Sequence, residues 1–232
     1  MYIDKDQVLR YLGYKPESTR YSQQMLEKID YYILLGTTLL EPNTTHRIFN
    51  RVHLDHRGVL LQEADLLLPG KDISDHLRYA KKVCIVAATI GPQLEAEVSK
   101  LFKQGEYAAG TILDAVGTDA VEKVADRLQE SLKASAMKQG YKLTWRFCSG
   151  YGDFPVTVQP QLLKAVNAQS IGITVTDSCM LLPQKSIIGV VGFTPGDMDT
   201  PVMDKCSHCQ AENCAYRNRG DKCAKTTRND SQ

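Results

Sequence analysis

The 232-residue chain lacks the compositional extremes that mark several classes of protein. Glycine and proline number only 16 and 9, and no apolar heptad persists, which argues against collagen-like and coiled-coil proteins. Lysine and arginine number 28 against 27 aspartates and glutamates, whereas a dedicated nucleic-acid-binding protein carries a clear basic excess. Because 43% of the residues are hydrophobic, the chain can bury a core, and disorder is excluded as its main state.

Long apolar segments are missing as well. The longest, at 83–90, has eight residues and includes Cys84 and Thr89, whereas a membrane-spanning helix needs about 20. Residues 1–6 show neither the basic nor the apolar segment of a signal peptide. We therefore expect a cytoplasmic protein without membrane or nucleic-acid partners, in a compartment where disulfides are rare.

Apolar periodicity and turn residues predict helices and strands in irregular alternation. Helices are expected over 4–13, 18–36 (capped by Ser18 or Thr19), 72–81, 92–105, 107–139 and 161–166, and strands over 46–61 (a hairpin), 83–89, 171–176 and 186–193. Without a regular βαβ repeat, this order predicts an α+β fold with a mixed or antiparallel sheet flanked by helices. We divide the chain into a domain over 1–195, helical in residues 1–45, and a polar linker and tail over 196–232.

The helix expected over 107–139 carries three carboxylates, Glu122, Asp126 and Glu130, at spacings of four residues. This spacing puts them on one face, where like charges disfavour a helix by roughly a few tenths of a kcal/mol per pair. One interpretation is a solvated face, neutralised by the basic residues beside it. The other is a surface that binds an amine or a cation, and the spacing alone leaves both open.

A glycine-containing segment follows, with the sequence Trp-Arg-Phe-Cys-Ser-Gly-Tyr-Gly-Asp-Phe-Pro at 145–155. Its Arg146 is suited to bidentate capture of a carboxylate, and its glycines let a ligand approach the main chain. A tight turn with a surface arginine is the structural alternative. No G-x-G-x-x-G or P-loop sequence is present, so dinucleotide and nucleoside-triphosphate binding have no motif in their favour.

Three motifs in order resemble the activation domain of cobalamin-dependent methionine synthase. They are Ala-Asp-Arg-Leu-x-Glu at 125–130, Arg-x-x-x-Gly-Tyr at 146–151 with Pro155, and Ile-Thr-Val-Thr-Asp-Ser-Cys-Met-Leu-Leu-Pro-x-x-Ser-x-x-Gly at 173–189. The resemblance extends over about a third of the chain. It implies the fold of that domain, binding of S-adenosylmethionine, and a part in a methionine synthase-type methyltransferase activity, the reductive remethylation of cobalamin.

The resemblance also implies a binding site. Arg146 would bind the carboxylate of S-adenosylmethionine, Glu130 would face its ammonium or sulfonium group, and Tyr151 with the Gly150 backbone would contact the rest. Asp126 would support these contacts. The charges suit a zwitterionic amino acid with a sulfonium centre.

The chain departs from the family in ways that bear on its partners. It shows no homocysteine, folate or cobalamin module, and Val156-Thr157 follow Pro155 where the family tends to place a histidine. We therefore expect a partner to carry the cobalamin. That partner would be a methionine synthase lacking its own activation domain or another corrinoid protein.

Four of the seven cysteines cluster near the C-terminus, in the pattern C-x2-C-x4-C-x8-C formed by Cys206, Cys209, Cys214 and Cys223. The segment around them is too polar for core packing, and metal ligation would supply the order that it lacks. Four thiolates suit zinc and iron–sulfur clusters equally well.

The function implied by the resemblance favours an iron–sulfur cluster over zinc. Remethylation consumes a low-potential electron, which a [4Fe-4S] cluster could relay from a ferredoxin or flavodoxin. With zinc instead, the chain would be a non-catalytic adaptor that binds a corrinoid protein. The other cysteines, Cys84, Cys148 and Cys179, are expected to be ordinary packing residues.

Overall fold

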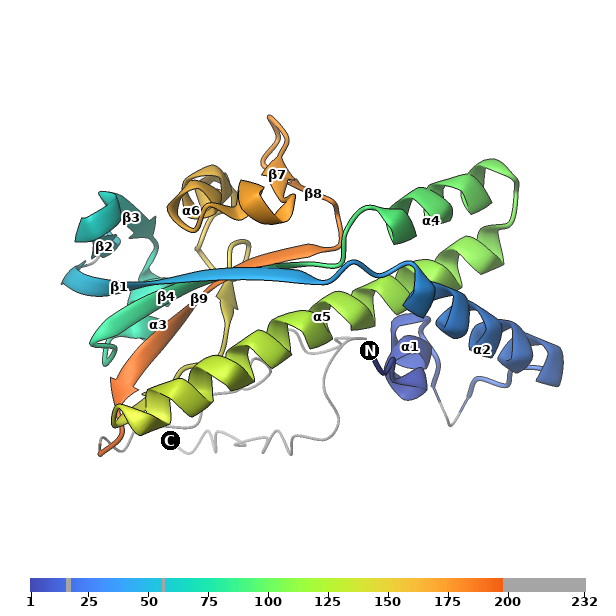
Figure 1. Cartoon of the computed structure of the whole chain (residues 1–232), viewed down its shortest axis with the longest axis horizontal. Coiled ribbons are helices and arrows are strands. Elements are labelled where there is room, and N and C mark those ends of the chain that lie inside the picture. Colours follow the sequence, from blue (N-terminus) through green and yellow to red (C-terminus); the bar gives the residue numbers. More distant parts are fainter. Residues whose placement is uncertain (16–17, 56, 198–232) are drawn as a thin grey trace, which may run out of the picture.

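The computed structural model describes residues 1–15, 18–55 and 57–197 of the chain (Figure 1). Its elements are α1 (Lys5–Tyr11), α2 (Gln23–Thr38), β1 (Asn43–Asp55), β2 (Gly58–Leu61), β3 (Leu66–Pro69), α3 (Lys71–Leu77), β4 (Lys82–Thr89), α4 (Gln93–Lys103), α5 (Tyr107–Lys138), β5 (Tyr141–Leu143), β6 (Phe147–Cys148), α6 (Gln159–Ala165), β7 (Thr174–Val175), β8 (Leu181–Leu182) and β9 (Ser186–Pro195). Short 3₁₀ turns lie at Gln62–Ala64, Val156–Val158 and Ala168–Ile171.

One sheet organises the domain, with the strand order β3-β2-β1-β4-β9-β5 and with β6 also paired to β9. All of its described pairs are antiparallel, and β7 and β8 form a separate antiparallel pair. The long strand β1 pairs with β4 along its first part and with β2 along its last residues. The predicted α+β class with a helix-flanked sheet is confirmed, and among the described strands the sheet is antiparallel.

Helices cover both faces of the sheet, with α5 on one side and α6 with the β7–β8 pair on the other (Figure 1). Successive side chains of β4 point to opposite faces of the sheet, so they pack alternately against the α6 side and the α5 side. Val83 and Ile85 pack in a cluster with Leu162 of α6, whereas Cys84 packs with Leu132 of α5. This central strand is therefore apolar on both faces.

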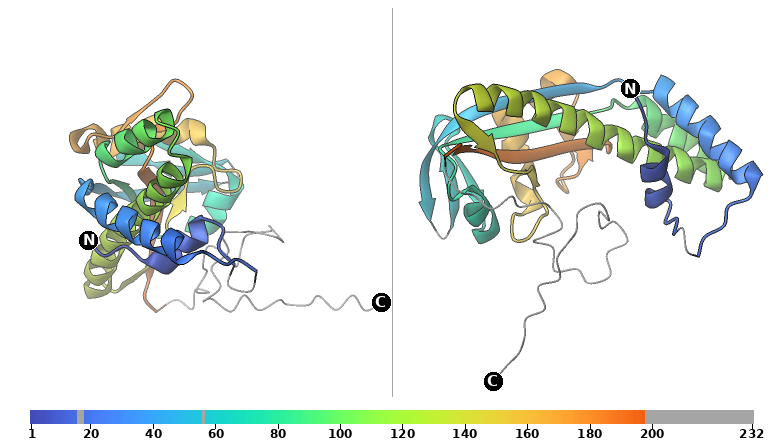
Figure 2. Two further views of the ribbon diagram at one scale, coloured as in Figure 1. Left: turned by 90° about the vertical axis from the view of Figure 1, so that its right-hand side faces the viewer. Right: turned by 90° about the horizontal axis from the view of Figure 1, so that it is seen from below.

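The N-terminal helices α1 and α2 and the later helix α4 pack around the first half of α5 and form a second core beyond the end of the sheet (Figures 1 and 2). Gly36 permits the close approach of α2, since a Cβ there would lie only 2.6 Å from Cγ1 of Val116 on α5. At about 1.5 Å per residue, the 32 residues of α5 span about 48 Å and connect this core with the sheet. No helix in the described ranges is long and apolar enough to cross a membrane.

Most expected elements are present, and the differences are local. Ser22, rather than Ser18 or Thr19, caps α2, and its Oγ accepts a hydrogen bond from the Met25 N–H at 3.2 Å. Of the strand expected over 171–176 only Thr174–Val175 is extended, because Ala168–Ile171 forms a 3₁₀ turn that Gly172 ends in the left-handed region. The domain boundary at residue 195 stays a prediction, since residues 198–232 lie outside the described ranges.

Candidate functional site

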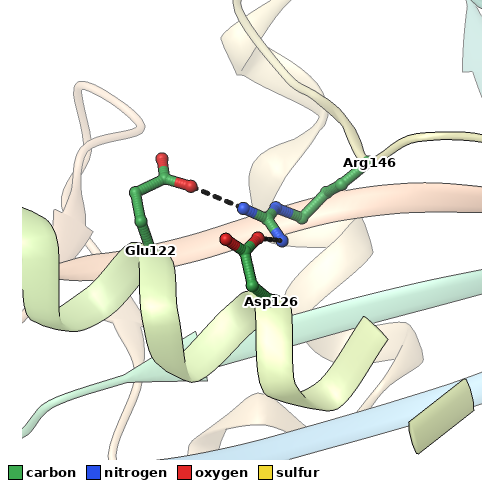
Figure 3. A network of polar contacts seen from close by, with 3 residues as sticks. All are labelled: Glu122, Asp126 and Arg146. Atoms are coloured by element: carbon green, nitrogen blue, oxygen red, sulfur yellow. Dashed lines mark hydrogen bonds and ion pairs between the residues drawn. The ribbon is translucent and has the colours of Figure 1, made fainter. Parts of the chain in front are cut away.

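The site begins with an irregularity at the edge of the sheet. β5 pairs Leu143 with Phe193, and β6 pairs Phe147 with Val190. The edge chain thus advances four residues while β9 advances three, which is the one-residue excess of a β-bulge. Bulges redirect side chains, and Arg146 lies in this bulged segment with its side chain directed at α5 (Figure 3).

Gly189 on β9 provides the room for the arginine. A Cβ at this position would lie 2.7 Å from Cγ of Arg146 and 3.1 Å from Sγ of Cys148. The aliphatic part of Arg146 therefore passes over a strand position that carries no side chain. The arginine is 1% exposed and is among the largest fully buried side chains described.

Two carboxylates of α5 hold the buried guanidinium (Figure 3). Nη2 of Arg146 donates to Oε2 of Glu122 at 2.6 Å, and Nη1 donates to Oδ1 of Asp126 at 3.1 Å. Helical spacing of four residues places these acceptors side by side. Burial acts to lower the pKa of Arg146, but Cys148, Glu122 and Asp126 outweigh it and raise that pKa above its ordinary value. The guanidinium is thus permanently charged and meets two carboxylates.

The carboxylates differ from the arginine in their exposure to solvent. The Glu122 side chain is 34% exposed and that of Asp126 is 64% exposed. The cluster therefore has a buried positive centre and a solvent-facing negative rim. Because both carboxylates are partly exposed, either one can leave the guanidinium and become solvated by water.

The segment 148–154, which we call the glycine loop, lies beside this cluster. The Gly150 N–H donates to the Phe154 carbonyl at 2.7 Å, and the Tyr151 N–H donates to the Cys148 carbonyl at 3.1 Å. Gly150 has φ +92°, in the left-handed region that glycine adopts at little cost. The loop is thus a compact turn held by its own main chain.

Tyr151 is the partly exposed aromatic residue of the glycine loop. Burial, with smaller contributions from Cys148 and Glu122, raises the pKa of its phenol well above the ordinary value. The hydroxyl therefore keeps its proton and can donate a hydrogen bond at neutral pH. Its ring lies 6.1 Å from that of Trp145 and 5.8 Å from that of Phe147.

His76 of α3 joins Trp145, Phe147 and Tyr151 in a group of neighbouring aromatic rings, which we call the aromatic wall. Its ring lies 4.7 Å from that of Trp145 and 5.0 Å from that of Phe147, and its Nε2 is 3.0 Å from the Trp145 carbonyl oxygen. Sequence reasoning missed this contact because about 70 residues separate His76 from the motif. No local pattern in the sequence signals it.

Several buried polar atoms around this site have no hydrogen-bond partner in the part of the chain that the structure describes. They include Nε of Arg146, Nε1 of Trp145 and Oε1 of Gln159, whose amide nitrogen donates to Oγ of Ser149 at 2.9 Å. Buried polar groups are nearly always satisfied by protein, water or ligand. Each of these three atoms is therefore a candidate contact for a polar ligand or an ordered water.

Comparison with known proteins finds similarity to solved structures. The structure is similar to the crystal structure of the MetH reactivation domain bound to AdoHcy, with a TM-score of 0.61. The match covers 86% of this chain and 76% of that chain at 14% sequence identity. The chain has the fold of the MetH reactivation domain. No protein-family model and no curated protein sequence matches it.

The fold places the residues expected at a binding site in two groups. Asp126, Arg146, Gly150 and Tyr151 come together on α5, the bulge and the glycine loop. Glu130 lies a further turn along α5, where its side chain is 71% exposed and forms an ion pair with Lys133 at 3.6 Å. Its contact with a ligand stays a prediction.

Glu122 is the residue that sequence reasoning did not select for the site, although it makes the shorter of the two contacts with Arg146. The acidic row already contained the signal. Glu122 and Asp126 are four residues apart, as are Asp126 and Glu130, so either pair could face the arginine. The sequence does not show which turn of the helix lies opposite the bulge.

The expected metal site lies outside the described residues. Cys206, Cys209, Cys214 and Cys223 all fall within 198–232. Within the described ranges, no three or more His, Cys, Asp or Glu side chains group in a way that could hold a metal ion. The four-thiol site thus stays a prediction.

Proposed function

We propose that this protein binds S-adenosylmethionine beside Arg146 and acts as an activator in the reductive remethylation of cobalamin carried by a partner protein. The observation that carries the proposal is the buried guanidinium held between Glu122 and Asp126, next to the glycine loop. The fold supports it, since the similar MetH reactivation domain was crystallised with AdoHcy.

The charges of the cluster fit the amino-acid end of S-adenosylmethionine. A ligand carboxylate can replace Glu122 or Asp126 on the guanidinium, because carboxylate–guanidinium bonds are equivalent in kind. The displaced carboxylate then faces the ligand's ammonium or sulfonium group. The exchange keeps Arg146 paired at every stage, so no charge is left buried alone.

The glycine loop fits the remainder of the ligand. A Cβ at Gly150 would meet only Cγ1 of Val156, at 3.4 Å, so other side chains do not crowd this side of the main chain. Tyr151 offers a neutral hydroxyl and a ring face. Glu130, one turn beyond Asp126, is the further acidic candidate for the sulfonium end.

The partner's cobalamin would supply the reduced cobalt that accepts the methyl group. The chain's own residues bind and orient the methyl donor, and positioning of this kind is a large part of such catalysis. The partner would be a corrinoid protein, such as a methionine synthase without its own activation domain. The electron would come from a ferredoxin or flavodoxin, relayed by a cluster on Cys206, Cys209, Cys214 and Cys223, and the reaction would take place in the cytoplasm.

Calorimetric titration with S-adenosylmethionine tests the binding claim. We expect wild-type protein to bind and Arg146→Met to lose binding, whereas Arg127→Met, which removes an exposed arginine from the same helix, retains it. Glu122→Gln and Glu130→Gln, measured side by side, decide which carboxylate faces the ligand's cation. Absence of binding to the folded wild-type protein refutes the proposal.

Anaerobic purification with metal analysis and visible spectroscopy tests the electron relay. Bound iron with a broad visible absorption is the expected result, and it should disappear when the four tail cysteines are replaced by serine. Colourless protein that carries zinc contradicts the relay and favours the adaptor alternative.

A further inference from the structure

Helix α3 has no side-chain cap from its own sequence. The residue before it is Gly70, with φ +125° and no side chain to accept hydrogen bonds from the first turn. Its cap comes from the glycine loop instead. Oδ2 of Asp153 accepts the Lys71 N–H at 2.6 Å, and Oδ1 accepts the Asp72 N–H at 2.9 Å. A residue about 80 positions away thus satisfies two of the N–H groups that a helix start leaves unpaired.

The contact is reciprocal. The carboxylate of Asp72 accepts a hydrogen bond from the Asp153 N–H at 3.2 Å. Two glycines make the approach possible, since a Cβ at Gly70 would lie 2.6 Å from Oδ1 of Asp153, and one at Gly152 would overlap Oδ2 of Asp72. Each aspartate therefore fixes the main chain of the segment opposite, and neither glycine position tolerates a side chain.

Helix α3, to which Asp153 attaches the loop, is itself packed into the core. Its Ile73 and Leu77 are fully buried in the core cluster that also contains Phe147, which precedes the glycine loop, and Phe154, the last residue of the loop. The loop's own bonds fix its internal shape. The buried Phe154 and the Gln159–Ser149 hydrogen bond attach the loop to the core and to α6, and the Asp153 carboxylate attaches it to α3. Tyr151 lies two residues from this attachment point.

We propose that Asp153 is a positioning residue of the binding site, which holds Gly150 and Tyr151 in place through its cap on α3. This inference rests on the proposed function, because the ligand concerned is S-adenosylmethionine. Asp153 does not contact the ligand itself. Ligand affinity depends on it because a loop that must be ordered upon binding weakens the complex by the free energy of that ordering.

Three variants test the inference. Asp153→Ala removes both acceptors, Asp153→Asn keeps one acceptor oxygen, and Ser22→Ala removes the cap of α2, far from the site, as the matched control. The measurements are affinity for S-adenosylmethionine by calorimetry and amide hydrogen exchange of residues 148–154 by mass spectrometry.

We expect Asp153→Ala to bind S-adenosylmethionine about tenfold more weakly, because the loss of a helix cap changes an equilibrium constant by about this factor. The amides of residues 148–154 should also exchange faster, because the loop is no longer held to α3. Asp153→Asn should fall between Asp153→Ala and wild type. Ser22→Ala should lower the unfolding midpoint yet leave both the affinity and the loop exchange unchanged.

The outcomes separate the two claims. Wild-type protein that fails to bind S-adenosylmethionine refutes the proposed function. Wild-type protein that binds, together with Asp153→Ala that binds equally well, overturns the positioning role alone. Equal losses of affinity in Asp153→Ala and Ser22→Ala also overturn it, since they reflect general destabilisation.

Discussion

The Arg146 cluster is unequally exposed, and this makes a sharp prediction for stability. The guanidinium is 1% exposed, whereas Glu122 and Asp126 are 34% and 64% exposed. Removing the carboxylates leaves a buried charge without a partner, but removing the arginine leaves two charges that water already reaches. The double variant Glu122→Ala/Asp126→Ala should therefore destabilise the protein more than Arg146→Met does.

The magnitudes follow from these exposures. A buried charge that loses its partners costs about 3–5 kcal/mol of unfolding free energy, which we expect for the double alanine variant. In Arg146→Met the new side chain fills the space of the aliphatic stem. The remaining carboxylates repel one another by a few tenths of a kcal/mol, and the partly exposed pairs that are lost carry a screened energy, so we expect a loss below about 2 kcal/mol.

Urea unfolding followed by circular dichroism at pH 7 measures both values from the same transition. The matched control is Glu122→Gln/Asp126→Asn, which keeps two acceptor oxygens for the guanidinium and should lie between the other variants. A larger loss for Arg146→Met than for the double alanine variant refutes the assignment of a buried cation with a solvent-facing acidic rim.

Other positions give further expected results. Gly189→Ala should cost about 1–3 kcal/mol in urea unfolding and weaken S-adenosylmethionine binding, because the new methyl group collides with the Arg146 stem; unchanged values would contradict the packing described. Burial raises the pKa of the Cys84 thiol to about 12, so the folded protein keeps a proton that the unfolded chain loses above about pH 8.5. Stability should therefore fall as pH rises from 9 to 11, by up to about 1.4 kcal/mol per pH unit, and urea midpoints of Cys84→Val should show a flatter dependence. Asp119→Ala removes a 3% exposed carboxylate that accepts the Asp4 N–H, and hydrogen exchange should rise in residues 1–14 but not in the sheet.

The elements that were predicted correctly carry their signals locally. The apolar period of residues 107–139 marks α5, and Asp4 caps α1 as expected, with its side chain accepting the Asp6 N–H. The run at 83–89 reads as a buried strand because both faces of β4 are covered. Residue type and spacing within a few positions suffice for such features.

The parts that were not predicted depend on contacts between distant segments. The bulge that directs Arg146 at α5 follows from the register of two edge strands on β9, which no local pattern encodes. The start of α3 was expected near Asp72, but its cap at Asp153 comes from about 80 residues away. The choice of Glu122 within the acidic row likewise depends on where the sheet edge crosses the helix.

Trp145 is the only tryptophan of the chain, and it lies in the aromatic wall of the site. Its fluorescence therefore reports on this one region, whereas far-ultraviolet circular dichroism reports largely on the helices, including α5 and those packed around its first half. Agreement of the two signals during unfolding would show that the site melts together with the helical core. An earlier fluorescence transition would show instead that the edge of the sheet opens on its own.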